Sequence, residues 1–441
     1  MLTAAIGISI FILLLLLGMP VAFAFVACVA FLIFGFGLDP QFLLPYSLSR
    51  MQSLVILAIP FFIIAGNLME KGNIVEPLAD FINSIASRLR GGLATVGIIT
   101  NAVFGAISGS AAAAIVCIGP VMIPRLEKEG YPRGYATALM TSAAGLSLLI
   151  PPSIDMIFYG WLTRTSVTAC FLAGVFPGIL MTLLFCFFNW VMVGRLPTVK
   201  KPRPLGSFRE VGREVASTGL RALPALMLPV IILGSIYGGI ATATEAAAVA
   251  AFLAIPLGFF VYRGLTLRRF ATALIDSGIT VGVIMVMIFA SLMVGRILAM
   301  ENIPTQITNG IMSVTENKYA ILLMANMVMI LMGMLMDDIT GMILSIILLL
   351  PIIKEIGISS IHFAAIVTTN LTLGLFSPPF APLLFLGIRV GNTNFPAIFR
   401  TSMMIIFFIY LPVLLLTTFL PPLSEWLPVA VLGEKVMIPI K

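Results

Sequence analysis

The sequence predicts an all-α polytopic membrane protein made of two inverted repeats, and three observations support this fold class. First, 60% of the 441 residues are hydrophobic and only 10% are charged, whereas about a quarter of a soluble domain is charged. Second, apolar runs of the roughly 20 residues that a membrane-spanning helix needs recur along the whole chain. Third, a doubled proline interrupts two such runs, at Pro151-Pro152 in SLLIPPS and at Pro378-Pro379 in GLFSPPF.

The N-terminal apolar run, residues 2–37, is too long for a secretory signal and lacks a basic start and a small-residue cleavage site. We therefore expect two mature helices hinged at Gly18-Met19-Pro20. The net charge of +7 comes from basic residues in short loops between apolar runs. This pattern orients a protein in a membrane and does not indicate a nucleic-acid partner.

An internal repeat becomes visible when the chain is shifted along itself so that Pro151-Pro152 falls on Pro378-Pro379. The same shift carries Pro124 onto Pro351, Gly130 onto Gly357 and Thr141 onto Thr368. Matched prolines and glycines are informative in a chain where matches between leucines or alanines are common by chance. The predicted organisation is a first repeat (1–195), a cytoplasmic basic connecting segment (196–219), a second repeat (220–420) and a C-terminal tail (421–441).

The distribution of Lys and Arg predicts opposite membrane orientations for the two repeats. Cytoplasmic loops collect Lys and Arg, and the connecting segment is strongly basic. The flanks of residues 91–129 are basic as well, whereas the flanks of the equivalent residues 318–356 carry balanced charge. Equivalent segments are therefore expected to face opposite sides of the membrane.

Both of these segments, 91–129 and 318–356, are expected to form re-entrant helical hairpins that turn at mid-depth. Their turns read GAISGSAAAA and GMLMDDITGM, and such polar groups are tolerated in a bilayer only where they are buried in protein or line a cavity. Each hairpin precedes a helix broken at the doubled proline, residues 133–163 and 360–388. The amphipathic residues 74–90 and 303–315 are expected to be interfacial helices that link a moving part to its scaffold.

Paired broken helices are typical of secondary transporters. A break leaves carbonyl oxygens that coordinate cations such as sodium, and it exposes positive helix N-termini that attract anions. The sequence holds no P-loop, no HExxH motif and no nucleophile with a nearby histidine base. We therefore expect a transporter and not an enzyme.

The ordered motifs resemble the large membrane subunit of the tripartite ATP-independent periplasmic (TRAP) transporters, and the resemblance covers essentially the whole chain. The motifs are IPFFIIAGNLM (59–69), FGAISGSAAAA (104–114), LIPPSI (149–154), GGIATATEAAA (238–248) and LGLFSPPF (373–380). The resemblance implies a multi-pass, elevator-type protein of the ion-transporter superfamily in a bacterial inner membrane. It also implies sodium-coupled uptake of a small organic anion, with a periplasmic substrate-binding protein and a small four-helix membrane subunit as partners.

Candidate site residues come from the hairpin tips and the breaks. Asp337 aligns with Ser110, and its alternative role is a helix N-cap. Asp155 stands where the family usually has an uncharged residue, so we expect it to affect ion or substrate choice. The predicted sodium ligands are Ser110, Gly109, Gly145, Asp337, Gly341, Thr372 and Gly374. The predicted substrate contacts are Ser108, Ser110, Pro151, Ser153, Asp155, Thr340, Ser377 and Pro378.

Other functions stay open at this stage. A stand-alone sodium–carboxylate symporter would need no binding protein, and a membrane enzyme acting on a lipid carrier would need acids, His or Arg clustered at a membrane face. The anion is left open among C4-dicarboxylates, sialic acid, sugar acids and keto acids. Arg296 is expected to reach the outer surface, Glu245 to interact with a helix N-terminus, and His362 to have an interfacial role.

Overall fold

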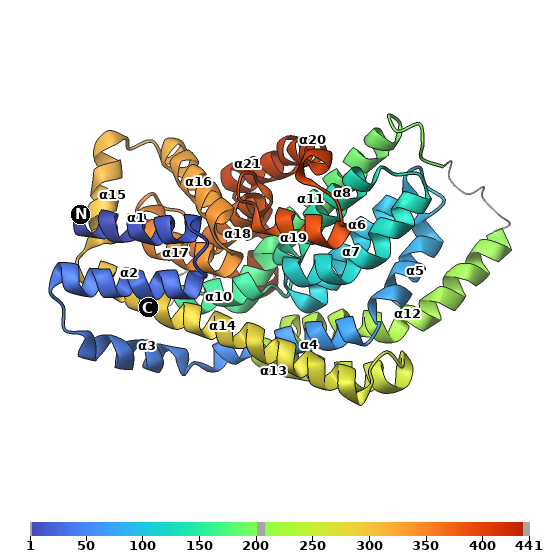
Figure 1. Cartoon of the computed structure of the whole chain (residues 1–441), viewed down its shortest axis with the longest axis horizontal. Helices are drawn as coiled ribbons and strands as arrows, with labels where there is room; N and C mark the ends of the chain where they lie inside the picture. The colour runs from blue at the N-terminus through green and yellow to red at the C-terminus, as the bar shows by residue number, and fades with distance from the viewer. Residues whose placement is uncertain (1, 201–207, 435–441) are drawn as a thin grey trace.

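The computed structural model describes residues 2–200 and 208–434, and within this part of the chain all regular secondary structure is helical. Among the described residues, eight helices are long and apolar enough to cross a membrane. The predicted all-α polytopic fold class is therefore confirmed. The molecule is elongated, and the N-terminal helices lie at one end of its long axis (Figure 1).

The N-terminal apolar run forms two helices, α1 (Leu2–Leu16) and α2 (Val21–Phe36), which are separated at the predicted hinge. They contain 15 and 16 residues, fewer than the roughly 20 of a full span. They pack against each other closely, because a Cβ on Gly7 would lie only 2.7 Å from Leu32 Cδ2.

The rest of the first half contains three short helical segments, a longer helix, a 12-residue helix, a helical hairpin, a broken helix and a final long helix. In order, these elements are η1 (Pro40–Phe42), α3 (Leu43–Met51), η2 (Leu54–Leu57), α4 (Ala58–Lys71), α5 (Val75–Ala86), α6 (Gly92–Ser108), α7 (Ala111–Lys128), α8 (Arg133–Ala144), α9 (Leu146–Leu149), α10 (Ile154–Thr163) and α11 (Val167–Val193).

The second half also begins with two helices, continues with one long helix in place of the segments from η1 to α4, then repeats the order of a short helix, a hairpin, a broken helix and a final helical segment, and ends in a further helix. Its elements are α12 (Phe208–Tyr237), α13 (Ala243–Pro256), the π-helical turn η3 (Leu257–Val261), α14 (Leu267–Met300), α15 (Ile303–Val314), α16 (Lys318–Leu335), α17 (Asp338–Glu355), α18 (Ser360–Phe376), α19 (Pro382–Gly391), α20 (Phe395–Ile405), the π-helical turn η4 (Ile406–Tyr410), α21 (Leu411–Phe419) and α22 (Pro422–Leu432).

The two halves correspond at the level of individual helices. The shift that carries Pro151 onto Pro378 also carries both ends of α7 onto the ends of α17, and it carries Arg133, where α8 begins, onto Ser360, where α18 begins. Helices α5 and α15 both contain 12 residues. They lie toward opposite ends of the long axis (Figure 1), as the predicted inversion requires. The orientation in a membrane stays a prediction.

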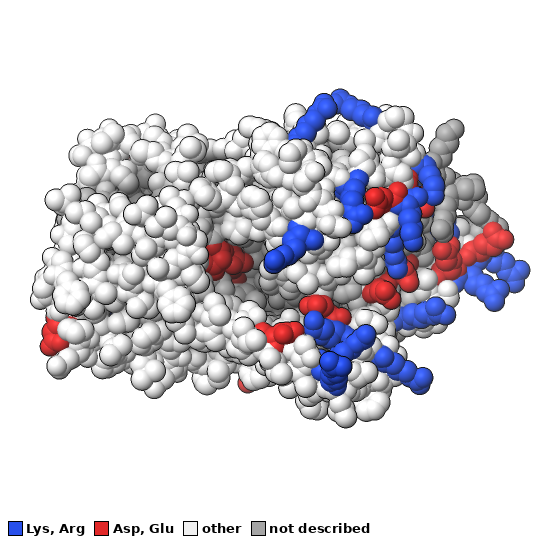
Figure 2. Space-filling view, viewed as in Figure 1, with Lys and Arg blue, Asp and Glu red and all other residues white. Residues whose placement is uncertain are grey.

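Charge is distributed unevenly along the long axis. On the face shown in Figure 2, Lys and Arg gather at the end where α5 and α12 lie, and the end with α1 and α15 shows none. The predicted cytoplasmic side corresponds to this basic end. Acidic atoms also lie in a recess at the middle of the same face.

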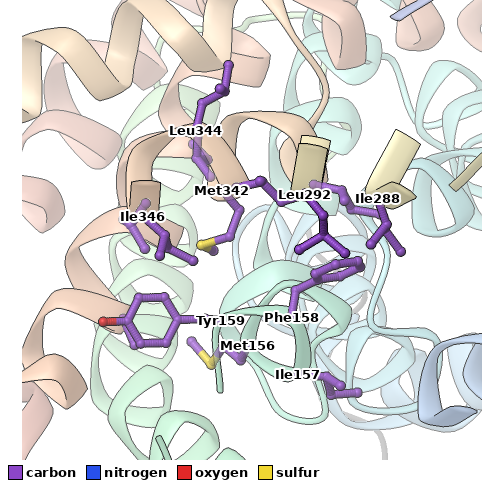
Figure 3. Packing of buried hydrophobic residues seen from close by; sticks show 14 of the residues in the cluster. Met156, Ile157, Phe158, Tyr159, Ile288, Leu292, Met342, Leu344 and Ile346 are labelled. Carbon is purple, nitrogen blue, oxygen red and sulfur yellow. The ribbon is translucent and has the colours of Figure 1, made fainter. Parts of the chain in front are cut away.

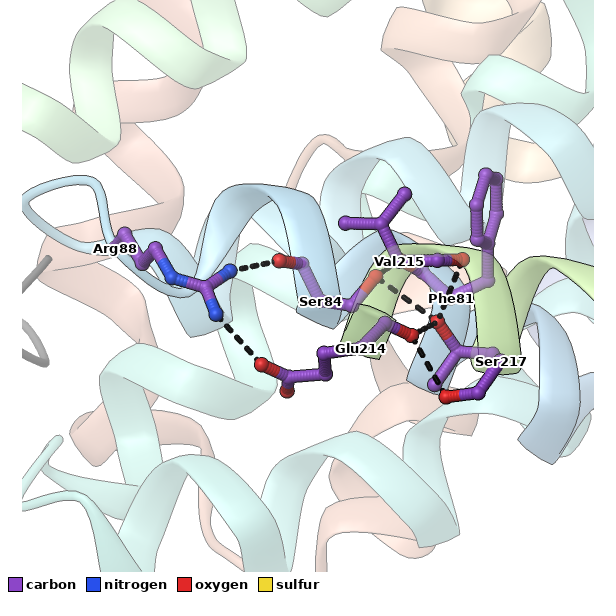
Figure 4. Close-up of polar contacts among 7 residues, drawn as sticks. Phe81, Ser84, Arg88, Glu214, Val215 and Ser217 are labelled. Carbon is purple, nitrogen blue, oxygen red and sulfur yellow. Dashed lines mark hydrogen bonds and ion pairs between the residues drawn. The ribbon is translucent and has the colours of Figure 1, made fainter. Parts of the chain in front are cut away.

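Helix α12 begins inside the predicted connecting segment, at Phe208, and residues 201–207 lie outside the described part of the chain. Its polar start is docked on α5 (Figure 4). Arg88 Nη2 lies 2.5 Å from Glu214 Oε2, and Thr218 Oγ1 lies 3.0 Å from Ser84 Oγ. The connection between the halves therefore includes part of a helix that is held to the first half by polar contacts.

The predicted C-terminal tail contains a packed helix, α22, and residues 435–441 lie outside the described residues. Helix α22 packs against α11, with the rings of Phe176 and Trp426 5.7 Å apart. It also covers His362, which is fully buried with Nδ1 2.5 Å from Ser424 Oγ and Nε2 3.3 Å from the carbonyl oxygen of Thr418. The expected interfacial role of His362 is therefore wrong.

Candidate functional site

The first hairpin turns at Gly109 and Ser110. Gly109 has a φ of 60°, a left-handed conformation that favours glycine. Ser110 is the N-cap of α7, and its Oγ accepts a hydrogen bond from the amide of Ala113 at 3.4 Å. The amide of Ile154 donates to the carbonyl oxygen of Gly109 at 3.3 Å, and a Cβ on Gly109 would lie 2.7 Å from Pro152 O. The tip and the break therefore form one packed unit without room for a side chain.

The second hairpin turns at Met336 and Asp337. Asp337 is the N-cap of α17, because its Oδ2 accepts a hydrogen bond from the amide of Thr340 at 3.4 Å. Asp338 accepts one from the amide of Ile339 at 3.0 Å. The alternative role of Asp337 as a helix cap is thus observed. Its other oxygen, Oδ1, has no hydrogen-bond partner among the described residues, so capping leaves half of the carboxylate available to a cation.

The two tips are equivalent positions with different charge. The shift that relates the two halves carries Ser110 onto Asp337 and Ala113 onto Thr340, so the same backbone amide donates to the same cap in both halves. A serine oxygen and a carboxylate both satisfy a helix N-terminus. Only the carboxylate adds a negative charge to the site.

Both broken helices are interrupted where the doubled prolines predict. Helix α9 ends before Pro151-Pro152 and α10 begins at Ile154, whereas α18 ends before Pro378-Pro379 and α19 begins at Pro382. Both Pro–Pro peptide bonds are cis. Proline removes a backbone donor and clashes with the preceding turn, and two in a row end each helix beside a hairpin tip.

The two broken helices meet each other at equivalent residues. A Cβ on Gly145 would lie 2.7 Å from Thr372 Cγ2, and the shift between the halves carries the first of these positions onto the second. Tyr410 also contacts this crossing point, since its hydroxyl donates a hydrogen bond to the carbonyl oxygen of Ser142 at 2.7 Å. Gly145 is therefore a packing contact where the halves cross.

Each half-helix beyond a break packs on the hairpin of the other half. Helix α10 packs on α17, and α19 packs on α7. In Figure 3, Tyr159 of α10 lies on the side of Met342 and Ile346 of α17, and Phe158 points toward Leu292 and Ile288 of α14. This exchange brings residues of the first break to the second hairpin.

The packing of α10 on α17 brings an unusual residue, Asp155 in the first turn of α10, to the second hairpin. It is fully buried, and neither carboxylate oxygen has a hydrogen-bond partner in the described part of the chain. It lies within electrostatic range of Asp338 and Asp337. A buried carboxylate without a partner is costly, and the negative charge of the nearby Asp337 and Asp338 adds to this cost, which favours a positively charged occupant.

Buried polar oxygens without partners concentrate at the tips and breaks. A sodium ion is bound by oxygen ligands from such discontinuous helices, so these atoms fit a cation site. Among the described residues no group of three or more His, Cys, Asp or Glu is arranged to hold a metal ion. The unpartnered oxygens at the tips and breaks belong to Ser108, Ser147, Ser153, Asp155, Asp337 and Thr340.

Three predicted residues are engaged in helix packing. The hydroxyls of Thr372 and Ser377 each donate to the carbonyl four residues earlier at 2.7 Å, which leaves only their lone pairs for a ligand. Gly341 lies against α18, where a Cβ would be 2.6 Å from Leu371 Cδ2.

Of two residues outside the tips, Glu245 has the role expected for it, whereas the expected position of Arg296 at the outer surface stays a prediction. Glu245 forms a capping box with Thr242, in which each side chain bonds the backbone of the other. Arg296 is exposed on α14 and is not part of the tips or breaks.

Two close backbone contacts were not predicted. A Cβ on Gly374 would lie 2.6 Å from Gly333 Cα, and a Cβ on Gly105 would lie 2.6 Å from Ser147 Cα. These contacts seat each hairpin on its broken helix. The sequence motifs contain these glycines, but the residues that they contact depend on how the helices cross, which the sequence does not indicate.

The sequence of the chain is similar to known transporter proteins along most of its length. Residues 8–423 match the family model of the DctM component of tripartite ATP-independent periplasmic transporters. A relative from Pseudomonas aeruginosa, the C4-dicarboxylate TRAP transporter large permease protein DctM, is 33% identical over 375 residues, covering 85% of this chain and 86% of the relative. The sialic acid TRAP transporter large permease protein SiaM of Vibrio cholerae is 30% identical over 421 residues, covering 95% and 97%.

The fold is also similar to that of a solved transporter. The crystal structure of the Alcanivorax borkumensis YdaH transporter matches with a TM-score of 0.60, covering 87% of this chain and 90% of that chain. The sequence identity is 13%, so this comparison shows likeness of fold alone.

Proposed function

The chain belongs to the DctM family of tripartite ATP-independent periplasmic transporters, and we propose that it carries a small organic anion across a bacterial inner membrane together with sodium. Members of this family are transporter permease components, so the chain is not an enzyme acting on a lipid carrier. The large permease assignment follows from the family, whereas sodium coupling, the anion and the membrane are our proposal.

The observation that carries the proposal is the pair of equivalent hairpin tips seated beside the two breaks. Ser110 and Asp337 cap α7 and α17 in the same way, and buried oxygens without partners surround both caps. Hydroxyl, carbonyl and carboxylate oxygens of broken helices are suitable ligands for sodium. The paired arrangement supports one cation position at each tip.

Charge explains why an anion would travel with cations. Asp155 occupies the first turn of α10, where a helix N-terminus would otherwise attract an anion. Together with Asp337 and Asp338 it makes the site negative, so an organic anion on its own would be repelled. Bound sodium offsets this charge, and binding of the anion would therefore depend on earlier binding of the cation.

The class of anion is proposed from the relatives. The two relatives described above are named for C4-dicarboxylates and sialic acid, and both ligands carry carboxylates. We propose that this chain takes an organic acid of this kind. A periplasmic binding protein would deliver the acid, and a small membrane subunit would support the large one.

The movement that we propose is of the elevator type. The hairpins, α6–α7 and α16–α17, and the broken helices around the two breaks are packed on one another as one block. Outside that block, α12 contacts α13, α13 contacts α4, and α4 contacts α14, and these four helices would form the scaffold. Helices α5 and α15 connect the two parts in sequence.

Uptake by proteoliposomes tests the proposal. The chain and its small membrane partner would be reconstituted, and uptake of labelled succinate and sialic acid would be measured with and without an inward sodium gradient and with and without the cognate binding protein. Uptake that requires sodium and the binding protein is the expected result. Uptake that is indifferent to sodium would contradict the coupling that we propose.

The same assay addresses the second candidate, a stand-alone sodium–carboxylate symporter. The likeness of fold to the YdaH transporter, at 13% identity, leaves this second candidate open. Sodium-driven uptake without the binding protein would favour this candidate over the tripartite one.

A further inference from the structure

Two adjoining cavities lie away from the hairpin tips, beside the last turn of α3 and the end of α10. One has a volume of about 550 Å³ and is lined by residues that include Arg50, Gln52, Trp161, Arg164 and Ser166. The other has a volume of about 400 Å³ and is lined by residues that include Tyr46, Arg50, Trp161, Arg296, Asn302 and Thr305. Arg50 and Trp161 line both cavities, so the two adjoin at these side chains, and we call them together the arginine vestibule.

The arginine vestibule carries three positive charges and no acid. Neither cavity is lined by Asp or Glu, and Arg50, Arg164 and Arg296 form no ion pair with any described residue. At the basic end of the molecule the situation differs, since Arg88, Arg125 and Arg133 each pair with a carboxylate. Three unpaired guanidinium groups around a shared cavity favour an anionic occupant.

Two of the arginines are held in place by one aromatic ring. Arg296 Cζ lies 4.9 Å and Arg50 Cζ lies 5.7 Å from the centre of the Tyr46 ring. Stacking on an aromatic face orients a planar guanidinium and leaves its N–H groups free to bind a carboxylate through two parallel hydrogen bonds. The cationic groups are thus ordered before any ligand arrives.

The N-terminus of a long helix adds to the positive potential. Helix α11 has 27 residues, and Ser166 and Val167, where it begins, line the larger cavity. Helix N-termini carry a partial positive charge and attract anions. Arg164, which precedes this helix, has a left-handed φ of 57° that ends α10 and fixes the chain at the rim of the cavity.

The walls of the arginine vestibule come from both parts of the proposed transport mechanism. Arg50 and Arg296 belong to α3 and α14, which lie outside the block of hairpins and broken helices. Trp161 and Arg164 belong to the end of α10, whose first turn carries Asp155. At 1.5 Å per residue, the nine residues from Asp155 to Arg164 place Arg164 about 14 Å from Asp155 along one helix.

We propose that the arginine vestibule binds the carboxylate of the transported anion on the outer side, before the anion reaches the hairpin tips. We place the arginine vestibule on the outer side of the membrane because Arg296 lies near one end of α14. The distribution of Lys and Arg predicts that this end faces outward. This inference rests on the proposed function. In this proposal, the arginine vestibule is an entry site for the anion. It holds the anion away from Asp155, Asp337 and Asp338 until bound cations have neutralised these acids.

Tryptophan fluorescence offers a direct test, because Trp161 lines both cavities and this chain has only two other tryptophans, Trp190 and Trp426. The chain with Trp190→Phe and Trp426→Phe, together with its small subunit, would be placed in nanodiscs of phosphatidylcholine and titrated with succinate. Succinamide, which has the same carbon skeleton and no charge, serves as the ligand control. A saturable change with succinate and none with succinamide is expected.

Variants of the arginines test which residues hold the probe. Arg50→Gln, which affects both cavities, and Arg296→Gln should each raise the apparent Kd for succinate by about ten-fold, the effect of losing one charge-assisted hydrogen bond. Arg268→Gln removes an exposed arginine at the opposite end of the same helix α14 and should leave the Kd unchanged. Equal Kd values in the parent and in both vestibule variants would overturn the proposal.

Two further measurements distinguish a transported anion from a lipid headgroup as the occupant. In nanodiscs that contain phosphatidylglycerol, the succinate signal should persist; a signal abolished by that lipid would assign the arginines to lipid headgroups and overturn the proposal. In proteoliposomes, Arg50→Gln should raise the KM for sodium-driven uptake and leave kcat near that of the parent. If the parent binds succinate but shows no sodium-driven uptake, the proposed function fails while the arginine vestibule stands.

Discussion

The two hairpin tips have the same geometry and different chemistry. Ser110 and Asp337 occupy equivalent positions, and each accepts a hydrogen bond from the backbone amide three residues later at 3.4 Å. The first tip is neutral, whereas the second has two carboxylates. Asp155 also belongs to the first half by sequence and lies with the acids of the second.

This difference separates what the fold needs from what transport needs. Either side chain satisfies the helix N-terminus, so stability does not require a carboxylate at Asp337. An ionised group in a membrane interior is costly and is usually functional. We infer that the first tip contributes neutral oxygen ligands and that the second supplies the charge that couples cations to the anion.

The largest loss of sodium-driven uptake is expected from Gly374→Ala. The added Cβ would lie 2.6 Å from Gly333 Cα and 2.9 Å from the carbonyl oxygen of Ile330, so the second hairpin could no longer sit on its broken helix. Overpacking of this kind costs about 1–3 kcal/mol. Sodium-driven uptake should fall below about a tenth of the parent value, and the thermal unfolding temperature should drop.

Gly310→Ala is the matched control for that experiment. Gly310 is exposed on α15, and a Cβ there would meet nothing within 4 Å. Alanine is also the better helix former by about 1 kcal/mol. If Gly374→Ala transports as well as Gly310→Ala, the close contact between the second hairpin and its broken helix has no role in transport.

The next largest effect is expected from Asp337→Asn. Asparagine is also a good N-cap, so α17 should keep its stability while the tip loses its charge. The sodium concentration for half-maximal uptake should rise by about ten-fold or more, since a charge-assisted interaction is worth about 1.5–3 kcal/mol. Unchanged sodium dependence would show that Asp337 is a structural cap alone.

A smaller effect on sodium dependence is expected from Ser110→Ala. Removing the cap of α7 should cost about 1 kcal/mol of stability, and losing one neutral ligand should raise the sodium requirement by a few-fold. Thr266→Ala removes the N-cap of α14, whose Oγ1 accepts from the amide of Arg269 at 3.2 Å, far from the tips. Both variants should unfold at lower temperature, but only Ser110→Ala should alter sodium dependence.

The smallest effect is expected from Asp155→Asn, which, unlike Gly374→Ala and Ser110→Ala, should raise the thermal unfolding temperature. Its carboxylate is buried without a hydrogen-bond partner in the described part of the chain, and an uncompensated buried charge destabilises the fold. Removing the charge should raise the thermal unfolding temperature and weaken cation coupling. A lower unfolding temperature, measured in the absence of sodium, would mean that the carboxylate is stabilised by its surroundings.

The parts of the fold that depend on local chemistry were predictable. Doubled prolines cannot continue a helix, so Pro151-Pro152 and Pro378-Pro379 predict both breaks. The shift between these pairs also predicts where α7, α8, α17 and α18 begin, because equivalent sequences form equivalent elements. Ser110 and Asp337 follow from the preference of helix N-termini for such side chains.

The parts that depend on packing between distant segments were not predictable. His362 is buried because α22 folds over it, and the sequence of 421–441 indicates no partner for that helix. Asp155 meets the acids of the second hairpin because α10 packs on α17. The arginine vestibule likewise unites α3, α10 and α14, which are far apart in the chain.

The most direct test of the central claim is the binding of radioactive sodium to the purified chain and its small subunit. Parent, Ser110→Ala and Asp337→Asn proteins would be compared in the absence of substrate. Two equivalent tips predict saturable binding in the parent, a reduction in each variant, and a larger reduction for Asp337→Asn. Sodium binding that is absent in the parent, or undiminished in both variants, would contradict the claim that the hairpin tips and breaks form the cation sites.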